Sequence, residues 1–552
     1  MAPRPPSPCL ILAALTVLGS AFLAGCNRGG ESASGEFLSA AHAGPANAGA
    51  QGEGQDSPHA ASRSRPGPAP TELKAAASVA TSSEAMDVAP HPDQEEALFA
   101  GWPKPRAVLF ITGQQLGYIE PCGCTGLVNQ KGGLSRRYTL ARQLADRGWP
   151  LVPVDVGNQV RTFGRQSEVK FQVTVDGMKK MGYRAIAFGA EDLRMTALEL
   201  YAAVSSTDKQ KTPFVSANTS ILDPDHVPKY QIVEAGGKRI GITAVLGSEW
   251  KRNITSSEIT LRPPEEALRE VVPKLQQQKC DVYVLLAHAS IEDSQRLAAQ
   301  FPVFQIVVTA GGVGDPTYQP DPIPGTNALL VQVGVKGMYV GVMGIFDGPK
   351  RPYRYQRVPL DARFPDAREM LQLLASYQEQ LREMDLDGLG LRPVPYPTGK
   401  TFIGSQACKP CHGHAHAVWA RTDHAHALES LVEPGERSEV PRHFDPECIS
   451  CHVIGWNPQK YFPYTSGYLR MDKTPAMCDV GCENCHGPGA EHVAAETLAA
   501  SASPREIDAL RAALRLPLAE AEKKCLECHD LDNSLEFHTP GAFDRYWAEV
   551  AH

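Results

Sequence analysis

Four copies of the pentapeptide Cys-x-x-Cys-His, all after residue 400, constrain this chain more than any other feature. Cys-x-x-Cys-His is the attachment signal for c-type haem. Two thiols three positions apart can form thioethers with both vinyl groups of one porphyrin, and the following imidazole then reaches the iron. The four copies are Cys408-Lys-Pro-Cys411-His412, Cys448-Ile-Ser-Cys451-His452, Cys482-Glu-Asn-Cys485-His486 and Cys525-Leu-Glu-Cys528-His529.

The motifs predict four covalently bound haem c groups, with the histidine of each motif as the proximal iron ligand. From Cys408 to His552 the chain offers about 36 residues for each motif, too few for a conventional apolar core. We therefore predict a mostly α-helical, loop-rich multihaem cytochrome c domain over residues 401–552, whose porphyrins supply most of the interior. Zinc is the alternative occupant of paired Cys and His, but the fixed position of His in all four copies favours haem.

The distal ligands must come from histidines outside the motifs, and here the sequence resembles the cytochrome c-554-type tetrahaem proteins. The resemblance rests on the segments Trp419–Ala427, Cys451–Gly455, Gly481–His492, Asn533-Ser534, Phe537 and Tyr546–His552. It implies His424, His492 and His552 as distal ligands. In this family one haem can lack a second protein ligand, and the candidates to fill that position here are His443, His416 and Met471.

The N-terminus predicts export. Apolar and small residues run from Cys9 to Ala24 and end in Leu23-Ala24-Gly25-Cys26-Asn27, which resembles the lipobox of bacterial lipoproteins. The resemblance implies a signal peptide over residues 1–25 and acylation of Cys26, and Asn27 slightly favours the outer membrane. An ordinary signal peptide is the alternative. Residues 26–103, rich in Ala, Gly, Ser and Pro, predict a disordered tether.

Between residues 104 and 360, short apolar runs alternate with amphipathic stretches, a pattern that predicts α/β layering with helices over the faces of a sheet. The predicted strands cover residues 107–112, 150–156, 185–188, 214–216, 282–287 and 304–309, with a hairpin over 230–245. The predicted helices cover residues 134–147, 169–181, 197–204, 264–278 and 292–300. Residues 361–400 predict a charged helix, over 366–385, followed by a Pro-rich linker.

Local motifs in this α/β region resemble the 5′-nucleotidase branch of the calcineurin-like metallophosphatases. The segments that carry the resemblance are Thr112–Pro121, Gly132–Arg136, Asp155–Asn158, Phe188–Asp192 and Leu286–His288. It implies a layered metallophosphatase-like sandwich. Most of the family's metal ligands are replaced, because Gln114, Leu116, Asn158 and Ala190 stand where the family has Asp, His, Asp and Asn, and His288 alone survives. Since a two-metal hydrolase needs carboxylates and imidazoles for both ions, we predict a non-hydrolytic domain.

Three further cysteines leave alternatives open. Cys122 and Cys124 directly follow the first altered metal motif and are a candidate redox or soft-metal pair, or else a structural disulfide or inert thiols. For Cys478, four residues before the third haem motif, we predict a spare buried thiol, with a disulfide as the alternative.

Together these features predict an exported, lipid-anchored tetrahaem cytochrome on the periplasmic side of the cell envelope, which transfers electrons between redox partner proteins. The degenerate metallophosphatase-like domain would bind a partner or ligand. The alternative is a multihaem oxidoreductase with one open iron that acts on a small nitrogen or sulfur compound. A formal net charge of −8, from 54 Lys and Arg against 62 Asp and Glu, argues against nucleic acid as a partner.

Overall fold

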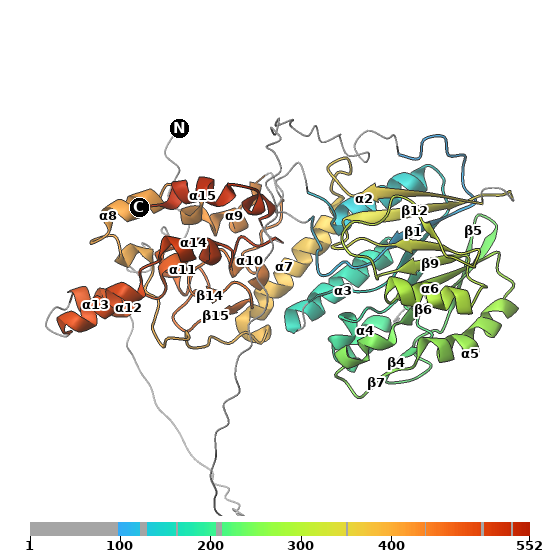
Figure 1. The fold of residues 1–552 in the computed structure, drawn as a ribbon, viewed down its shortest axis with the longest axis horizontal. Coiled ribbons are helices and arrows are strands. Elements are labelled where there is room, and N and C mark those ends of the chain that lie inside the picture. The colour runs from blue at the N-terminus through green and yellow to red at the C-terminus, as the bar shows by residue number, and fades with distance from the viewer. Residues whose placement is uncertain are drawn as a thin grey trace, which may run out of the picture. The chain divides into compact units, whose positions relative to one another are not determined.

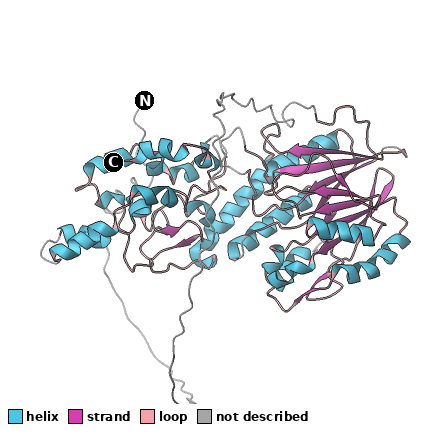
Figure 2. Cartoon of the chain, viewed as in Figure 1, coloured by secondary structure: helices cyan, strands magenta, loops and turns pink. Residues whose placement is uncertain are grey.

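The computed structural model describes residues 98–121, 130–161, 164–205, 212–348, 352–435, 438–497, 502–531 and 534–552. Figure 1 follows the elements along the chain, and Figure 2 shows that the long strands belong to the α/β region while helices and loops make up the haem-motif region. Within these ranges, no helix has the length and apolar character that a bilayer crossing requires. The predicted signal peptide, Cys26, most of the predicted tether, Cys122 and Cys124 lie outside the described residues.

The first sheet is built around strand β1 (Ala107–Thr112), every residue of which is buried. Strand β1 pairs in parallel with β2 (Leu151–Asp155) and antiparallel with β12 (Tyr339–Ile345). The outer strands are β3 (Ala185–Ile186) and β13 (Tyr353–Pro359), so the order is β13-β12-β1-β2-β3. Thr112 and Asp155, the first residues of two segments that resemble the metallophosphatases, are the last residues of β1 and β2.

The second sheet has the order β10-β11-β9-β8-β6-β5, with parallel inner strands and an antiparallel strand at each edge. Its strands are β5 (Gln231–Ala235), β6 (Lys238–Leu246), β8 (Val282–His288), β9 (Ile306–Thr309), β10 (Asp321–Pro322) and β11 (Leu329–Gln332). The short strands β4 (Thr219–Ile221) and β7 (Ile259–Leu261) pair with each other as a separate ribbon.

The two sheets share one apolar layer, and helices cover their outer faces. Because successive residues of a strand point to opposite faces, Leu109 of β1 joins Ile242 and Val284 of the second sheet in one buried cluster. Its neighbour Phe110 belongs to a different cluster, which includes Leu140 of an outer helix. The predicted α/β layering is therefore confirmed.

The helices of this region occupy both outer layers. Helices α2 (Leu134–Asp146) and α3 (Arg165–Lys180) contribute to the buried cluster outside the first sheet, and α5 (Pro264–Gln277) and α6 (Ile291–Gln300) to the one outside the second. Helix α4 is Ala197–Val204 and begins with a capping box of Thr196 and Glu199.

Most predicted elements of the α/β region are present within one to four residues of their predicted ends. The predicted strand over residues 214–216 is wrong, because Phe214 forms only an isolated bridge with Ile186. Strands β11, β12 and β13 were not predicted. The charged helix after residue 360 is α7 (Arg368–Gly388), interrupted at Asp385, whose φ is 51°. Helix α7 joins Leu134 and Val173 in a buried cluster through Met370 and Leu374.

The haem-motif region consists of short elements joined by loops, in agreement with the predicted mostly α-helical, loop-rich domain. Its helices are α8 (Gly413–Trp419), α9 (Glu429–Val432), α10 (Pro446–Ile449), α11 (Cys482–His486), α12 (Ala490–Thr497), α13 (Pro504–Ala513), α14 (Leu518–Cys525) and α15 (Ala542–Val550), and its only named strands within the described residues are β14 (Trp456–Asn457) and β15 (Phe462–Pro463). One small apolar cluster, which includes Leu428, Ile454 and Trp456, is its buried centre.

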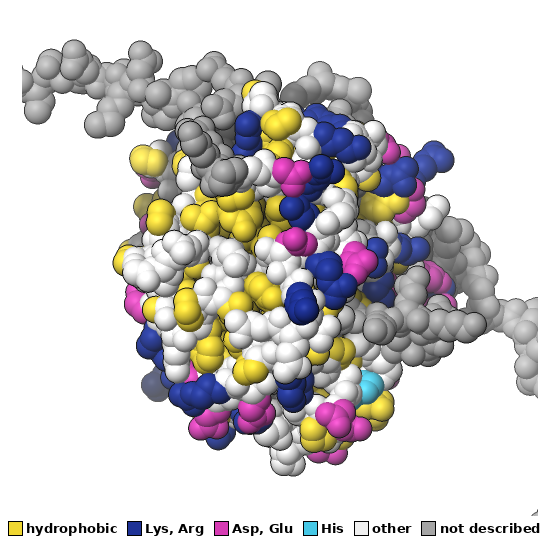
Figure 3. Space-filling view, turned by 90° about the vertical axis from the view of Figure 1, so that its right-hand side faces the viewer, with side chains coloured by type: hydrophobic (Ala, Val, Ile, Leu, Met, Phe, Trp, Pro, Cys, Tyr) yellow, Lys and Arg dark blue, Asp and Glu magenta, His cyan; other side chains and the backbone are white. Residues whose placement is uncertain are grey.

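The surface face drawn in Figure 3 carries basic and acidic side chains next to one another, with apolar side chains scattered between them. Ion pairs such as Arg262 with Glu270 and Arg296 with Glu265 show the same mixing of signs in the α/β region. A surface of mixed sign offers nucleic acid no broad basic field on this face.

Candidate haem sites

Each attachment motif forms a turn of helix that brings its two thiols to one side. The third motif is helix α11 itself. In the other three, the amide of the second cysteine donates a hydrogen bond to the carbonyl of the first, at 3.3 Å for Cys411, 3.3 Å for Cys451 and 3.1 Å for Cys528. Residues three apart on a helical turn lie on the same face. All eight motif thiols are free of disulfides and thus available for thioether bonds.

The three predicted distal histidines each face a proximal histidine of one motif. The ring centroids are 6.3 Å apart for His412 and His492, 6.0 Å for His424 and His529, and 5.8 Å for His486 and His552. Two imidazoles that share one metal, with bonds of about 2.0–2.1 Å to their nitrogens, place their ring centroids about 6 Å apart. These three pairs therefore have the separation that an iron between them requires.

Hydrogen bonds at Nδ1 fix the tautomer of several of these rings. Nδ1 of His452 lies 2.6 Å from the carbonyl oxygen of Ala427, and Nδ1 of His486 lies 2.8 Å from that of Leu514. A carbonyl oxygen only accepts, so Nδ1 carries the proton and Nε2 keeps its lone pair. Such an orienting hydrogen bond is typical of histidines that bind a metal through the other nitrogen.

Burial favours the neutral form of His529 and His424, the form that binding to a metal would require. Burial lowers the pKa of His529 to about 4, and the nearby His424 and His452 add to this effect. Burial also lowers the pKa of His424, against Asp423 and Glu549, which raise it.

A cavity of about 1040 Å³ is lined by residues of the second and fourth motifs and has the size of a cofactor site. Cofactor-sized pockets are usually about 300–1,000 Å³ and mostly apolar. His424 and His529, one of the three facing pairs, both line it. Its aromatic lining residues are Tyr396, Phe402, Trp456, Tyr464, Phe537, Phe543, Tyr546 and Trp547. The residues present thus fit a planar apolar macrocycle held from both faces.

The four motifs lie close enough for their thiols to touch in pairs. The thiol of Cys408 is hydrogen-bonded to that of Cys482, which lowers the pKa of Cys482 to about 6. The thiol of Cys451 is hydrogen-bonded to that of Cys528. The first motif is therefore next to the third, and the second next to the fourth, so groups attached to them would be neighbours.

The candidates for a fourth distal ligand occupy different surroundings. The ring of His443 contacts Phe444, with centroids 4.1 Å apart, and His443 is not among the residues that line the cavity described above. Its Nδ1 is buried and has no hydrogen-bond partner among the described residues. The other two candidates, His416 and Met471, are likewise not among the residues that line this cavity, and Nε2 of His416 is buried without a hydrogen-bond partner among the described residues. The predicted role of His443 stays a prediction.

The positions of the altered metal ligands in the α/β region are joined by amide hydrogen bonds. The side chain of Asn158 donates to Gln114 Oε1 at 2.9 Å, and Gln114 donates to the carbonyl of Ala310 at 3.0 Å. The Asn158 carbonyl oxygen accepts from the backbone of Glu191 at 2.9 Å. His288 is held through Nδ1 by the Val156 carbonyl at 2.9 Å. Neutral amides therefore satisfy one another where charged ligands would surround metal ions.

Two carboxylates lie in this cluster, Asp155 and Asp192, and both accept hydrogen bonds from the protein itself. Asp155 accepts from Thr112 and Gln159, each at 2.6 Å. Asp192 accepts backbone hydrogen bonds from Gly189, Asn158, Gln159 and, at a longer 3.4 Å, Val160. Burial raises the pKa of Asp192 to about 7, against these four donors, which lower it. No group of three or more His, Cys, Asp or Glu among the described residues is arranged to hold a metal ion.

The prediction of a spare thiol at Cys478 is wrong, because this cysteine is disulfide-bonded. The nine other cysteines within the described residues are free. The partner of Cys478 is therefore not among the other cysteines within the described residues. A burial signal alone could not have distinguished a thiol from a half-cystine.

Comparison with known proteins identifies the haem-motif region. Residues 407–487 match the family "Cytochrome c554 and c-prime". Cytochrome c-554 of Nitrosomonas europaea is 35% identical over 98 residues, which cover 16% of this chain and 39% of that protein. The matched family carries covalently attached haem c.

The α/β region has its own relatives. Apyrase of Aedes aegypti is 28% identical over 137 residues, which are 24% of this chain and 24% of that protein. Among solved structures, the 5′-nucleotidase precursor of Thermus thermophilus aligns with 50% of this chain and 59% of its own, at 20% identity and a TM-score of 0.44. The chain thus spans 39% of the length of that cytochrome c-554 and 24% of that of the apyrase.

The chain therefore carries a C-terminal cytochrome c554-type domain behind a 5′-nucleotidase-like α/β region.

Proposed function

We propose that this protein is an exported tetrahaem c-type cytochrome that transfers electrons between redox partner proteins. The observation that carries the proposal is the set of three facing histidine pairs, at 5.8–6.3 Å, each of which joins an attachment motif to a histidine elsewhere in the domain. Haem iron held between two imidazoles takes up and releases single electrons without an open position for substrate.

The protein's own residues in this proposal hold, orient and enclose the four haem groups. The cysteines at 408, 411, 448, 451, 482, 485, 525 and 528 form the thioethers, and the four motif histidines supply the proximal ligands. His492, His424 and His552 supply the distal ligands opposite His412, His529 and His486. The thiol contacts between motifs support short distances from each haem to the next, which electron transfer along a chain of haems requires.

The nucleotidase-like region serves in this proposal as a binding domain without hydrolytic activity. The support is the hydrogen bond between the side-chain amides of Asn158 and Gln114, next to Asp192, which accepts backbone hydrogen bonds. Export and acylation at Cys26 place the protein on the periplasmic side of the envelope, attached to a membrane by lipid. This part of the proposal is supported by the sequence of residues 1–27 alone.

The experiment is a haem count and an electron paramagnetic resonance spectrum of the purified, fully oxidised protein. We expect a mass increase of four haem groups and low-spin ferric signals from the three facing pairs. A count below four, or high-spin signals from more than one iron, would contradict the proposal. A high-spin signal from a single iron would instead support an open haem and favour the alternative of small-molecule oxidoreductase chemistry.

A further inference from the structure

The segment that precedes the second haem motif is attached to the nucleotidase-like region by two partly buried ion pairs, in each of which the basic side chain is buried. The first joins Arg442 to Glu120, which stands at the end of the first altered metal motif. Nε and Nη2 of Arg442 donate to the two carboxylate oxygens of Glu120, a bidentate arrangement. The Arg442 side chain is only 6% exposed, so solvent screens this pair weakly.

The second ion pair joins Glu447 to Lys170 of helix α3. Lys170 Nζ lies 2.7 Å from Glu447 Oε2, and the Lys170 side chain is 9% exposed. Burial lowers the pKa of Lys170, but the nearby carboxylates of Glu447 and Asp445 outweigh it, so the pKa is raised overall. The Lys170 ammonium group therefore keeps its charge at neutral pH. Its partner Glu447 directly precedes Cys448 in the sequence.

Asp445, between these pairs, fixes the position of the segment. Its carboxylate caps the short helix α10, which carries Cys448. The same carboxylate accepts hydrogen bonds from Gln166 of α3 at 2.7 Å and from Tyr377 of α7 at 3.0 Å. The helix turn that holds the second attachment motif is thus oriented by side chains of the preceding region.

Arg442 and Glu447 also line the cavity into which the second motif opens, together with Cys448, Cys451 and His452. Each of these two charged side chains lies between the cavity and the nucleotidase-like region. One side of it lines the cavity, and the other side contacts an oppositely charged residue of the nucleotidase-like region. Removal of the balancing charge would leave an unpaired charge at the cavity wall.

We propose that Lys170 and Glu120 are positioning residues for the haem attached at Cys448 and Cys451, through which the nucleotidase-like region sets the reduction potential of that haem. The inference rests on the proposed haem-binding function. Each residue acts through its partner, Lys170 through Glu447 and Glu120 through Arg442, and neither contacts the haem itself.

The two pairs predict potential changes of opposite sign. Without Lys170, the Glu447 carboxylate is unbalanced and stabilises the more positive ferric form, so the potential of this haem falls. Without Glu120, the Arg442 guanidinium is unbalanced and the potential rises. An effect of about tenfold on the ferric-to-ferrous equilibrium corresponds to about 59 mV for a one-electron couple. General loosening of the structure would not give opposite signs.

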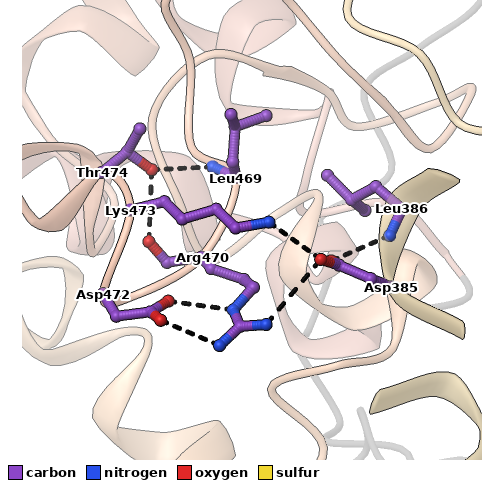
Figure 4. Close-up of polar contacts among 7 residues, drawn as sticks. All are labelled: Asp385, Leu386, Leu469, Arg470, Asp472, Lys473 and Thr474. Atoms are coloured by element: carbon purple, nitrogen blue, oxygen red, sulfur yellow. Dashed lines mark hydrogen bonds and ion pairs between the residues drawn. The ribbon is translucent and has the colours of Figure 1, made fainter. Parts of the chain in front are cut away.

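A control of matched chemistry is the exposed ion pair of Lys473 with Asp385, shown in Figure 4. Lys473 Nζ lies 2.9 Å from Asp385 Oδ2, and the side chains are 51% and 32% exposed. Asp385 also accepts from the backbone of Leu386, at 2.9 Å, where helix α7 is interrupted. This pair likewise joins α7 to the haem-motif region, but neither residue lines the cavity.

The experiment is a spectroelectrochemical titration of the full haem-loaded chain as wild type, Lys170→Met, Glu120→Gln, the double variant Lys170→Met with Glu447→Gln, and Lys473→Met. We expect one fitted component to fall in Lys170→Met and to rise in Glu120→Gln, with the other components unchanged. The double variant, in which both charges are gone, should return close to the wild-type value, and Lys473→Met should show no shift.

Two results would overturn the inference: unchanged potentials in both single variants, or shifts of the same sign. If Lys170→Met does not fold, Glu120→Gln against the Lys473→Met control still decides. The haem count of each preparation keeps the two proposals apart. Full haem loading with unmoved potentials refutes only the role of Lys170 and Glu120, whereas absence of haem at Cys448 and Cys451 refutes the proposed function.

Discussion

Replacement of Asp192 by Ala should destabilise the altered metal-site cluster without an effect on the haems. Asp192 accepts backbone hydrogen bonds from Gln159 at 2.7 Å and from Asn158 and Gly189 at 2.9 Å each. A buried donor left without its acceptor costs about 1–3 kcal/mol. Three such donors give a loss of at least about 3 kcal/mol, which makes local opening about a hundredfold more frequent.

Hydrogen exchange followed by mass spectrometry on the full chain is the appropriate assay, because it reports each segment separately. We expect faster exchange in peptides that cover residues 155–160 and 186–194, with peptides from the haem-motif region unchanged. Asp192→Asn, which keeps one acceptor oxygen, should give a smaller effect. Unaltered protection of residues 155–160 in Asp192→Ala would show that this carboxyl does not hold the cluster together.

The same residue predicts a dependence on pH. Burial raises the pKa of Asp192 from 3.8 to about 7 in the folded protein. A group whose pKa is raised by folding stabilises the protein below its unfolded pKa and loses that contribution as the pH rises through its folded pKa. Local opening of the cluster, corrected for intrinsic exchange rates, should therefore be easier at pH 8 than at pH 5 in the wild type, and much less pH-dependent in Asp192→Asn.

Three further predictions follow from the sites described above. His424→Ala should convert one low-spin haem to high-spin, because His424 is the ring that faces His529 at 6.0 Å, and added imidazole should reverse the change; an unaltered spectrum would contradict the ligand assignment. With added Mn²⁺, the protein should hydrolyse no nucleotide above the level of a heat-treated sample, and clear metal-dependent turnover would refute the non-hydrolytic proposal. Peptide mapping without reduction should join Cys478 to Cys122 or Cys124, since Cys9 and Cys26 belong to the predicted signal peptide and acylation site; a bond between Cys122 and Cys124 would exclude this.

Local chemistry explains what could be predicted from the sequence. The haem motifs need only five consecutive residues, and strand β1 is an unbroken apolar run, so both are visible without the rest of the fold. The helices α2 to α6 have the periodicity of half-buried helices. In contrast, strands β12 and β13 mix Gly, Tyr, Arg and Gln with apolar residues, as in Tyr353–Pro359. Pairing with β1, more than 200 residues away, identifies β12 as a strand, and pairing with β12 identifies β13.

The contacts between distant segments could not be predicted in the same way. The resemblance proposed which histidines are distal, but it did not assign each of them to a motif, since that depends on how the loops fold back. Lys170 and Glu447 are 277 residues apart in sequence, and each alone is an ordinary surface-type residue. Their burial follows from the packing of α3 and α7 against the segment before Cys448.

The capping role of Asp445 has a consequence for how this protein can be divided. A carboxylate that begins helix α10 while it accepts hydrogen bonds from Gln166 and Tyr377 makes the second attachment motif depend on another part of the same polypeptide. Expression of residues 401–552 alone would expose Asp445, Arg442 and Glu447 to water on the side now covered. A fragment prepared in this way would differ from the intact chain around the second attachment motif, so recombination of such modules would have to exchange the contacting helices as well.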